Sequence, residues 1–217
     1  MEVKILNRQN TVVNNYLSEI RNVDVQSDPL RFRKNISRIG SFMAYEVSKT
    51  MSYKDTQVRT PLGIADVMVP ADEVVVGTIL RAGLPMHEGV LDVFDHAQNC
   101  FVSAYRKYIN VDEFEINLEY VATAHLDDKV LLLADPMLAT GFSIEATYRA
   151  LKKYGTPKHT HIMCVIGSEA GVEFLSNALK DEPVTIWVAA VDPELNEHKY
   201  IVPGLGDAGD LCYGYKL

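Results

Sequence analysis

The sequence contains little cysteine and no long apolar run, and both features exclude classes of protein. Three of the 217 residues are cysteine, and Cys100, Cys164 and Cys212 show no CxxC or Cys/His spacing. This pattern predicts neither a zinc site nor a disulfide framework and favours a reducing, cytoplasmic location. No apolar stretch approaches the ~20 residues that a transmembrane helix needs, so we expect no membrane partner. The residues after Met1 lack the apolar core of a secretory signal, so we expect none.

Basic residues are fewer than acidic ones. Lysine and arginine number 21 against 29 aspartates and glutamates, giving a formal net charge of −8. Because sequence-independent affinity for nucleic acid comes from neutralising phosphates, we expect no nucleic-acid partner.

Internal repeats, low-complexity stretches and linker-like segments are also lacking. At this length, the prediction is a single domain over residues 1–217.

The N-terminal quarter is predicted to be mostly helical. Ser27, Asp28 and Pro29 form a typical helix start, with a capping side chain followed by a proline in the first turn. From Leu30 to Met51, apolar residues recur at steps of three and four, which indicates one apolar stripe on a long helix. We expect this helix to pack on a core or on a partner subunit.

After residue 57 the pattern alternates between short apolar runs and amphipathic segments. Strands are expected at 74–80, 101–105, 129–134, 160–166 and 184–190, and helices through 89–94, 143–154 and 169–179. Residues 58–63 predict a hairpin or loop, and the alternation at 114–121 predicts a half-exposed hairpin arm. This order predicts a mostly parallel sheet covered by helices on both faces. Ligands of such sheets bind beyond the carboxyl ends of the strands, so functional residues are expected there.

The segment from Ala134 to Ser143 follows one buried strand and leads into a helix. Thr140, Gly141 and Ser143 would lie at the helix N-terminus, where free N–H groups and the helix dipole favour an anion. Asp135, at the strand tip, would accept hydrogen bonds from sugar hydroxyls. The alternative is a capped helix without a ligand, and the local pattern alone leaves the two about even.

A second segment places an arginine directly after the strand at 74–80. Arg81 has the planar fork that binds phosphate oxygens in a bidentate manner. Ala82 and Gly83 would let the backbone approach an anion. The alternative is an ordinary surface arginine.

A third segment runs from Tyr200 to Asp210 and contains three glycines and one proline. This composition predicts neither a regular helix nor a central strand. We expect an ordered loop whose backbone groups could bind the edge of a flat polar ring. The alternative is a plain C-terminal turn.

Together, the segments ILRAGLPM (79–86), DPMLATGFS (135–143) and YIVPGLGDAGD (200–210) resemble the uracil phosphoribosyltransferase family. The resemblance extends from about Arg31 to the end. It implies an α/β, type I phosphoribosyltransferase fold, with a mostly parallel sheet flanked by helices, a small base-binding hood and a protruding β-arm. It also implies transfer of a 5-phosphoribosyl group from 5-phosphoribosyl 1-diphosphate (PRPP) to uracil, giving UMP and diphosphate in pyrimidine salvage. Magnesium (Mg2+) would bind with PRPP and would not be held directly by the protein.

The resemblance also implies roles for individual residues. Arg81, Asp135 and Asp207 are the expected catalytic residues. The expected PRPP-binding residues are Arg81, Arg106, Asp135, Pro136, Met137, Leu138, Ala139, Thr140, Gly141, Phe142, Ser143 and Asp207. The expected uracil-binding residues are Ile201, Gly206, Asp207 and Ala208.

Two positions depart from the family pattern. Phe142 stands where the family usually has the second glycine of ATGGS, so its side chain must stay out of the phosphate pocket. Leu211 stands where a basic residue commonly follows GDAGD. Two alternatives to the salvage enzyme remain: a catalytically weak nucleotide-sensing or regulatory protein on the same fold, and a phosphoribosyltransferase for another base, which PGLGDAGD opposes.

The sequence also predicts a homodimer or higher homo-oligomer. The arm at 114–121 and the long N-terminal helix offer apolar surface that a second copy could cover.

Overall fold

A computed structural model describes residues 1–108 and 114–216, and the side chains of residues 104–118 lie outside this description. The central sheet has the order β1-β10-β9-β7-β4-β5-β6. Its strands are β1 (Glu2–Ile5), β4 (Val74–Leu80), β5 (Gln98–Tyr108), β6 (Phe114–Thr123), β7 (Val130–Ala134), β9 (His159–Ser168) and β10 (Val184–Asp192). Every neighbouring pair along this order is parallel except β5 and β6. The predicted mostly parallel sheet is therefore confirmed.

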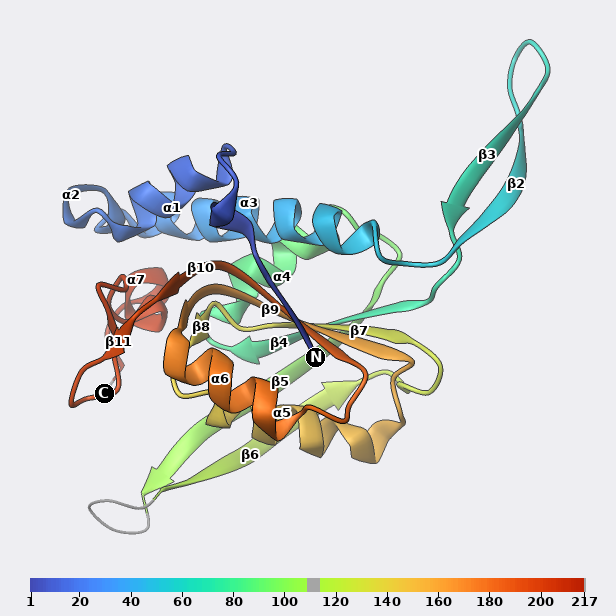
Figure 1. Cartoon of the computed structure of the whole chain (residues 1–217). Helices are drawn as coiled ribbons and strands as arrows, with labels where there is room; N and C mark the ends of the chain where they lie inside the picture. Colours follow the sequence, from blue (N-terminus) through green and yellow to red (C-terminus); the bar gives the residue numbers. More distant parts are fainter. Residues whose placement is uncertain (109–113, 217) are drawn as a thin grey trace.

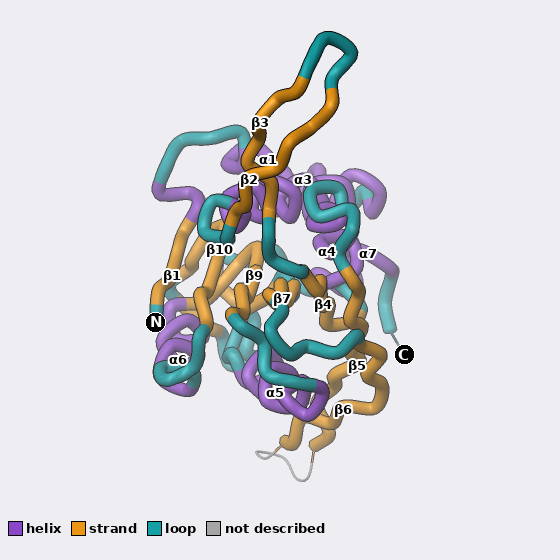
Figure 2. Tube along the Cα trace, turned by 90° about the vertical axis from the view of Figure 1, so that its right-hand side faces the viewer, coloured by secondary structure: helices purple, strands orange, loops and turns teal. Residues whose placement is uncertain are grey.

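Helices cover both faces of the sheet (Figures 1 and 2). On one face lie α1 (Val13–Arg21), α3 (Pro29–Ser48) and α4 (Gly83–Leu91), and on the other lie α5 (Phe142–Leu151) and α6 (Glu169–Ala178). Shorter elements are α2 (Val23–Gln26), α7 (Ala208–Tyr213) and the 3-10 turns η1 (Leu6–Arg8) and η2 (Lys152–Tyr154). Because β7 is buried along its whole length, its sequence is continuously apolar.

The long helix α3 forms as its sequence predicts. Its N-cap is Asp28, whose Oδ1 accepts hydrogen bonds from the N–H groups of Leu30 (2.9 Å) and Arg31 (3.2 Å). The apolar stripe is buried, and its members include Phe32, Ile36, Ile39, Met43 and Val47. The helix ends at Ser48, slightly before the predicted limit.

Two predictions about local structure were incomplete. The N-terminal quarter is not entirely helical, because β1 pairs in parallel with β10 and extends the sheet. A four-residue strand carries too short a pattern to predict, and its pairing partner lies near the other end of the chain. Helix α4 begins at Gly83 and ends at Leu91, so the segment expected at 89–94 contained only the last three residues of this helix. Pro85 falls in its first turn, where a missing N–H is tolerated.

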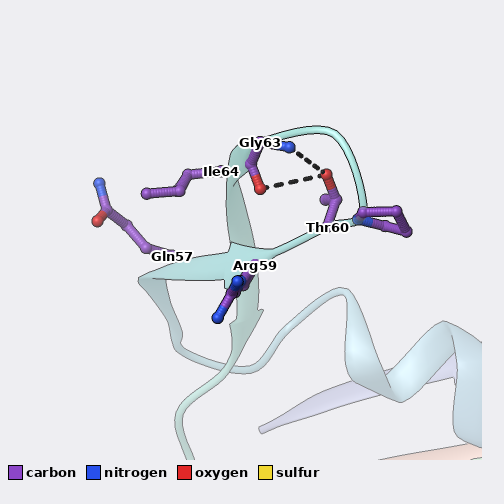
Figure 3. A pocket seen from close by; sticks show the side chains of 6 residues that line it. Gln57, Arg59, Thr60, Gly63 and Ile64 are labelled. Atoms are coloured by element: carbon purple, nitrogen blue, oxygen red, sulfur yellow. Dashed lines mark hydrogen bonds between the residues drawn. The ribbon is translucent and has the colours of Figure 1, made fainter.

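The predicted hairpin at 58–63 is the turn between β2 (Tyr53–Arg59) and β3 (Ile64–Pro70), which projects from the body of the molecule (Figure 1). Thr60 closes the turn, since its Oγ1 accepts the Gly63 N–H (3.1 Å) and donates to the Gly63 carbonyl (3.2 Å). Residues of the turn and of the adjoining strand ends line an open pocket (Figure 3). Because β3 ends just before β4 begins, this pocket lies beyond the amino end of β4, away from the edge where ligands are expected.

None of the helices in the described part of the chain has the length and apolarity that crossing a bilayer requires.

Candidate active site

The three predicted segments meet at one edge of the sheet. Since β4, β7 and β10 run parallel, the residues that follow or end them emerge on the same side: Arg81, Asp135 and Asp192. The C-terminal segment reaches this edge through β12 (Ile201–Val202), which pairs with β11 (Glu194–Leu195) and lies beside β9. Figure 1 shows β11 and α7 together at this end of the molecule.

The segment at 135–143 is held in place by the neighbouring strand and helix. The Pro136 carbonyl accepts hydrogen bonds from the N–H groups of Val165 (3.0 Å) and Ile166 (2.9 Å). The short strand β8 (Met137–Leu138) pairs with β9, and Ser168 Oγ donates to the Ala139 carbonyl (2.6 Å). The backbone that would bind a phosphate is thus fixed before a ligand arrives.

A small pocket lies at the N-terminus of α5. Its lining residues are Asp135, Met137, Ala139, Thr140, Gly141, Ser143 and Ile144. Gly141 precedes the helix with φ +85°, a left-handed conformation that favours glycine. The first N–H groups of a helix lack partners within it, and the dipole is positive at this end. The pocket therefore has the chemistry of an anion site, with a carboxyl group at its border.

The Asp135 carboxyl group has a pKa well above the usual value for an aspartate. Burial raises its pKa to about 7, and the hydrogen bond from the Met137 N–H (3.1 Å) opposes part of this shift. Asp135 is nevertheless partly exposed and borders the pocket. Near neutral pH, the group accepts hydrogen bonds when ionised and donates one when protonated.

The side chain of Phe142 stays out of the proposed phosphate pocket, as the family resemblance requires of a bulky residue at this position. Its ring packs edge-on against the ring of Phe174 on α6, with 4.4 Å between centroids and an interplanar angle of 66°. Phe142 is exposed, and it is not among the residues that line the pocket. The aromatic contact therefore directs the bulky side chain away from the anion site.

Arg81 connects its loop to the C-terminal segment. Its Nη2 donates to Asp210 Oδ1 (2.8 Å), and its Nη1 donates to the Gly214 carbonyl (3.1 Å). A Cβ atom at Gly209 would lie 3.0 Å from Arg81 Nη2 and 3.1 Å from Asp207 Oδ1. Arg81 and Asp207 thus both border Gly209, although they are far apart in the sequence.

The C-terminal segment is more regular than its composition predicts, which corrects the expectation of a loop throughout. Residues 201–202 form β12, and α7 begins at Ala208. Asp207 is the N-cap of α7, where its Oδ1 accepts the Asp210 N–H (2.9 Å). A capped helix start offsets the cost of Gly209 in the first turn. Ile201 and Ala208 are buried, whereas Gly206 is exposed and has open space beside it.

Leu211 is described by the structure, whereas the side chain of Arg106 is not. Leu211, the second departure from the family pattern, packs partly buried against the large apolar core that also contains Ile201 and Ala208. Arg106 lies on β5, but its side chain falls outside the described residues, as do the side chains of residues 114–118 in the arm predicted at 114–121.

Sequence reasoning missed a largely buried ion pair at this edge. Arg21, the last residue of α1, forms a bidentate pair with Asp192 at the end of β10, and both contact Gly204. Asp192 carried a usable signal, because it is a carboxylate just after the expected strand 184–190. Arg21 carried none.

The parallel sheet, the anion pocket after β7 and the arginine after β4 define a phosphoribosyltransferase architecture. A hypoxanthine phosphoribosyltransferase from Staphylococcus aureus has this fold, with a TM-score of 0.52 and 14% identity over 86% of this chain and 84% of that one. A solved protein from Aquifex aeolicus superimposes with a TM-score of 0.87 and 29% identity, and the match covers 99% of both chains.

Sequence comparisons specify the family. The family model for uracil phosphoribosyltransferase matches residues 7–214. A uracil phosphoribosyltransferase from Porphyromonas gingivalis is 52% identical over 217 residues, which is the full length of both chains. This chain belongs to the uracil phosphoribosyltransferase family.

Proposed function

We propose that this protein is the transferase of pyrimidine salvage that joins uracil to the 5-phosphoribosyl group of PRPP, releasing UMP and diphosphate. The supporting observation is the meeting of three groups at one sheet edge: the anion pocket of α5, the guanidinium of Arg81 and the segment from Ile201 to Ala208. Together they can bind a phosphate, a second anion and a flat polar base.

In this proposal, the pocket at the start of α5 holds the 5-phosphate of PRPP. The N–H groups and hydroxyls from Ala139 to Ser143 bind its oxygens, and Asp135 accepts hydrogen bonds from the ribose hydroxyls. These contacts place the ribose C1 atom opposite the base, so much of the rate acceleration comes from positioning.

Breaking the bond at C1 puts positive charge on the ribose and negative charge on the departing diphosphate. Arg81 stabilises the diphosphate, because an arginine has five N–H donors and its bonds to Asp210 and Gly214 leave others available. Arg106 is proposed as a second diphosphate contact. Asp207, which lies close to Arg81, supplies negative charge near the ribose.

The base-binding residues are proposed to be Ile201, Gly206, Asp207 and Ala208. Backbone N–H and C=O groups at this turn would pair with the polar edge of the pyrimidine. The open space beside Gly206 leaves room for a planar ring.

Magnesium is proposed to arrive bound to PRPP. Within the described residues, no group of three or more His, Cys, Asp or Glu side chains is arranged to hold a metal ion. Magnesium commonly binds through the phosphates of its substrate. When bound, the ion would neutralise charge on the diphosphate.

The proposed function is tested by measuring UMP formation from uracil and PRPP with magnesium, beside cytosine, hypoxanthine and orotate. Of these four bases, we expect only uracil to be converted to its nucleotide. A folded sample that binds UMP but turns over no base would contradict the enzyme and support a nucleotide sensor.

Substitutions then test the residues. Arg81→Ala should lower kcat/KM for PRPP on the order of 10²-fold, comparable to losing one transition-state donor.

Asp207→Asn is a sharper test than Asp207→Ala, because asparagine also caps helices and preserves α7. Loss of turnover with unchanged thermal stability is expected, and full activity would remove Asp207 from the mechanism.

We further propose that the chain forms one domain, works in the cytoplasm and assembles as a homodimer or higher homo-oligomer. The projecting β2–β3 hairpin supports assembly, since Leu62 at its tip is fully exposed and Ile64 is 71% exposed. Exposed apolar patches mark interaction surfaces. Light scattering at working concentration tests this, and a monomer mass would contradict it.

A further inference from the structure

We propose that Arg21 and Asp192 are positioning residues for the base, which hold Gly204 so that the segment from Ile201 to Ala208 presents its backbone to uracil. This inference rests on the proposed function. Arg21 and Asp192 lie outside the segments that carry the family resemblance, and they act through Gly204.

The contacts form a closed triangle. Arg21 Nη1 donates to Asp192 Oδ2 (2.7 Å), and Nη2 donates to Asp192 Oδ1 (2.7 Å). Arg21 Nη1 also donates to the Gly204 carbonyl (2.8 Å), while the Gly204 N–H donates to Asp192 Oδ2 (2.9 Å). Both backbone polar groups of Gly204 are therefore committed to this pair.

The pair is well placed to be rigid. Its side chains are largely buried, with 24% of Arg21 and 8% of Asp192 exposed. Asp192 ends β10, a strand inside the sheet, and Arg21 ends α1, where a cation is favoured by the helix dipole. Charged bidentate bonds of this kind fix geometry more strongly than neutral ones.

Gly204 is the point at which the base-binding segment turns back on itself. Its φ is +56°, and a Cβ atom there would lie 2.1 Å from the Ile201 carbonyl oxygen. Leu205, the next residue, is buried, and Gly206 then emerges into open space. Because Gly204 is held at both polar groups, the ion pair sets the direction in which residues 206–208 leave the core.

A second bidentate pair provides a matched control. Arg31 on α3 donates to Glu19 on α1 through Nε (2.7 Å) and Nη2 (2.8 Å). Its hydrogen bonds do not involve the base-binding segment. If an arginine–carboxylate pair on α1 contributed only stability, disrupting either pair would affect the kinetics in the same way.

The test compares Arg21→Gln and Asp192→Asn with the control Arg31→Gln. For each protein, the KM for uracil, the KM for PRPP, kcat and the urea midpoint are measured. Disrupting the Arg21–Asp192 pair should raise the KM for uracil about ten-fold or more, the change expected when a charged hydrogen-bond partner is lost. The KM for PRPP should stay within about two-fold, and Arg31→Gln should change neither constant.

Further variants keep the test decisive. Arg21→Lys should partly restore the KM for uracil, because an ammonium group can still reach both Asp192 and Gly204. If a single variant fails to fold, the double variant Arg21→Gln/Asp192→Asn removes both charges and leaves no unpaired ion. An unchanged KM for uracil, or equal rises in both Michaelis constants, would overturn the inference. A wild-type protein that forms no UMP would instead overturn the proposed function.

Discussion

Replacing Asp135 by asparagine should stabilise the protein at neutral and higher pH, although it removes a proposed active-site group. The pKa of this carboxyl rises from 3.8 to about 7, chiefly because burial disfavours its charged form. Asparagine has nearly the same shape, and its Oδ1 can still accept the Met137 N–H. The substitution therefore removes the charge and keeps the local hydrogen bond.

The sign and the size follow from proton linkage. Below about pH 4 the carboxyl is protonated in both folded and unfolded chains, so it costs nothing. Between about 4 and 7 the folded chain keeps a proton that the unfolded chain has lost, so stability falls as pH rises. Above about 7 the loss is complete. A shift from 3.8 to about 7 corresponds to about 4 kcal/mol, and this is an upper bound because Asp135 is partly exposed.

Urea unfolding at pH 4.5, 6 and 8 measures this effect, with fluorescence of the single, buried Trp187 as the signal. The free-energy difference between the asparagine variant and the wild type should grow from pH 4.5 to pH 8, because other titrating groups cancel between the two proteins. A difference that is the same at all three pH values would refute the reasoning. UMP formation measured on the same samples should fall in the variant, since a neutral amide is a poorer acceptor for ribose hydroxyls.

Three further predictions concern other parts of the molecule. Phe174→Leu should remove the edge-on contact with Phe142 and lower the unfolding free energy by about 1 kcal/mol; an unchanged urea midpoint would contradict this role. Cys212 is buried with its pKa raised to about 11, so the native protein should not react with a thiol reagent at pH 7.5, whereas the urea-unfolded protein should. Rapid labelling of Cys212 in the native protein would be inconsistent with its burial. Leu62→Asp should lower the assembled mass seen by light scattering without unfolding the chain, and an unchanged oligomeric mass would show that the hairpin tip plays no part in assembly.

Much of the central fold could be predicted from local sequence. Strands buried on both faces have continuously apolar sequences, so β4, β7, β9 and β10 were located. The start of α3 was located because its cap uses residues adjacent in the chain. By contrast, β1 exists through pairing with β10, and the start of α7 depends on the Asp207 cap, which compensates for a glycine-rich sequence.

The sequence by itself determined the family of the chain and predicted which residues carry the chemistry of the site. The order of Arg81, the segment at 135–143 and the segment at 200–210 defines the family, because each motif is short and local. It did not determine where these groups point. Phe142 is directed away from the anion pocket by Phe174, a residue of another helix.

Only the tertiary structure decided which distant residues support the site. Arg81 and Asp210 are 129 residues apart, and Arg21 and Asp192 are 171 apart. Such contacts follow no local period, since each joins elements that the parallel sheet brings to the same edge. The chemistry of the site is therefore predicted by short motifs, whereas its geometry depends on the packing of the whole chain.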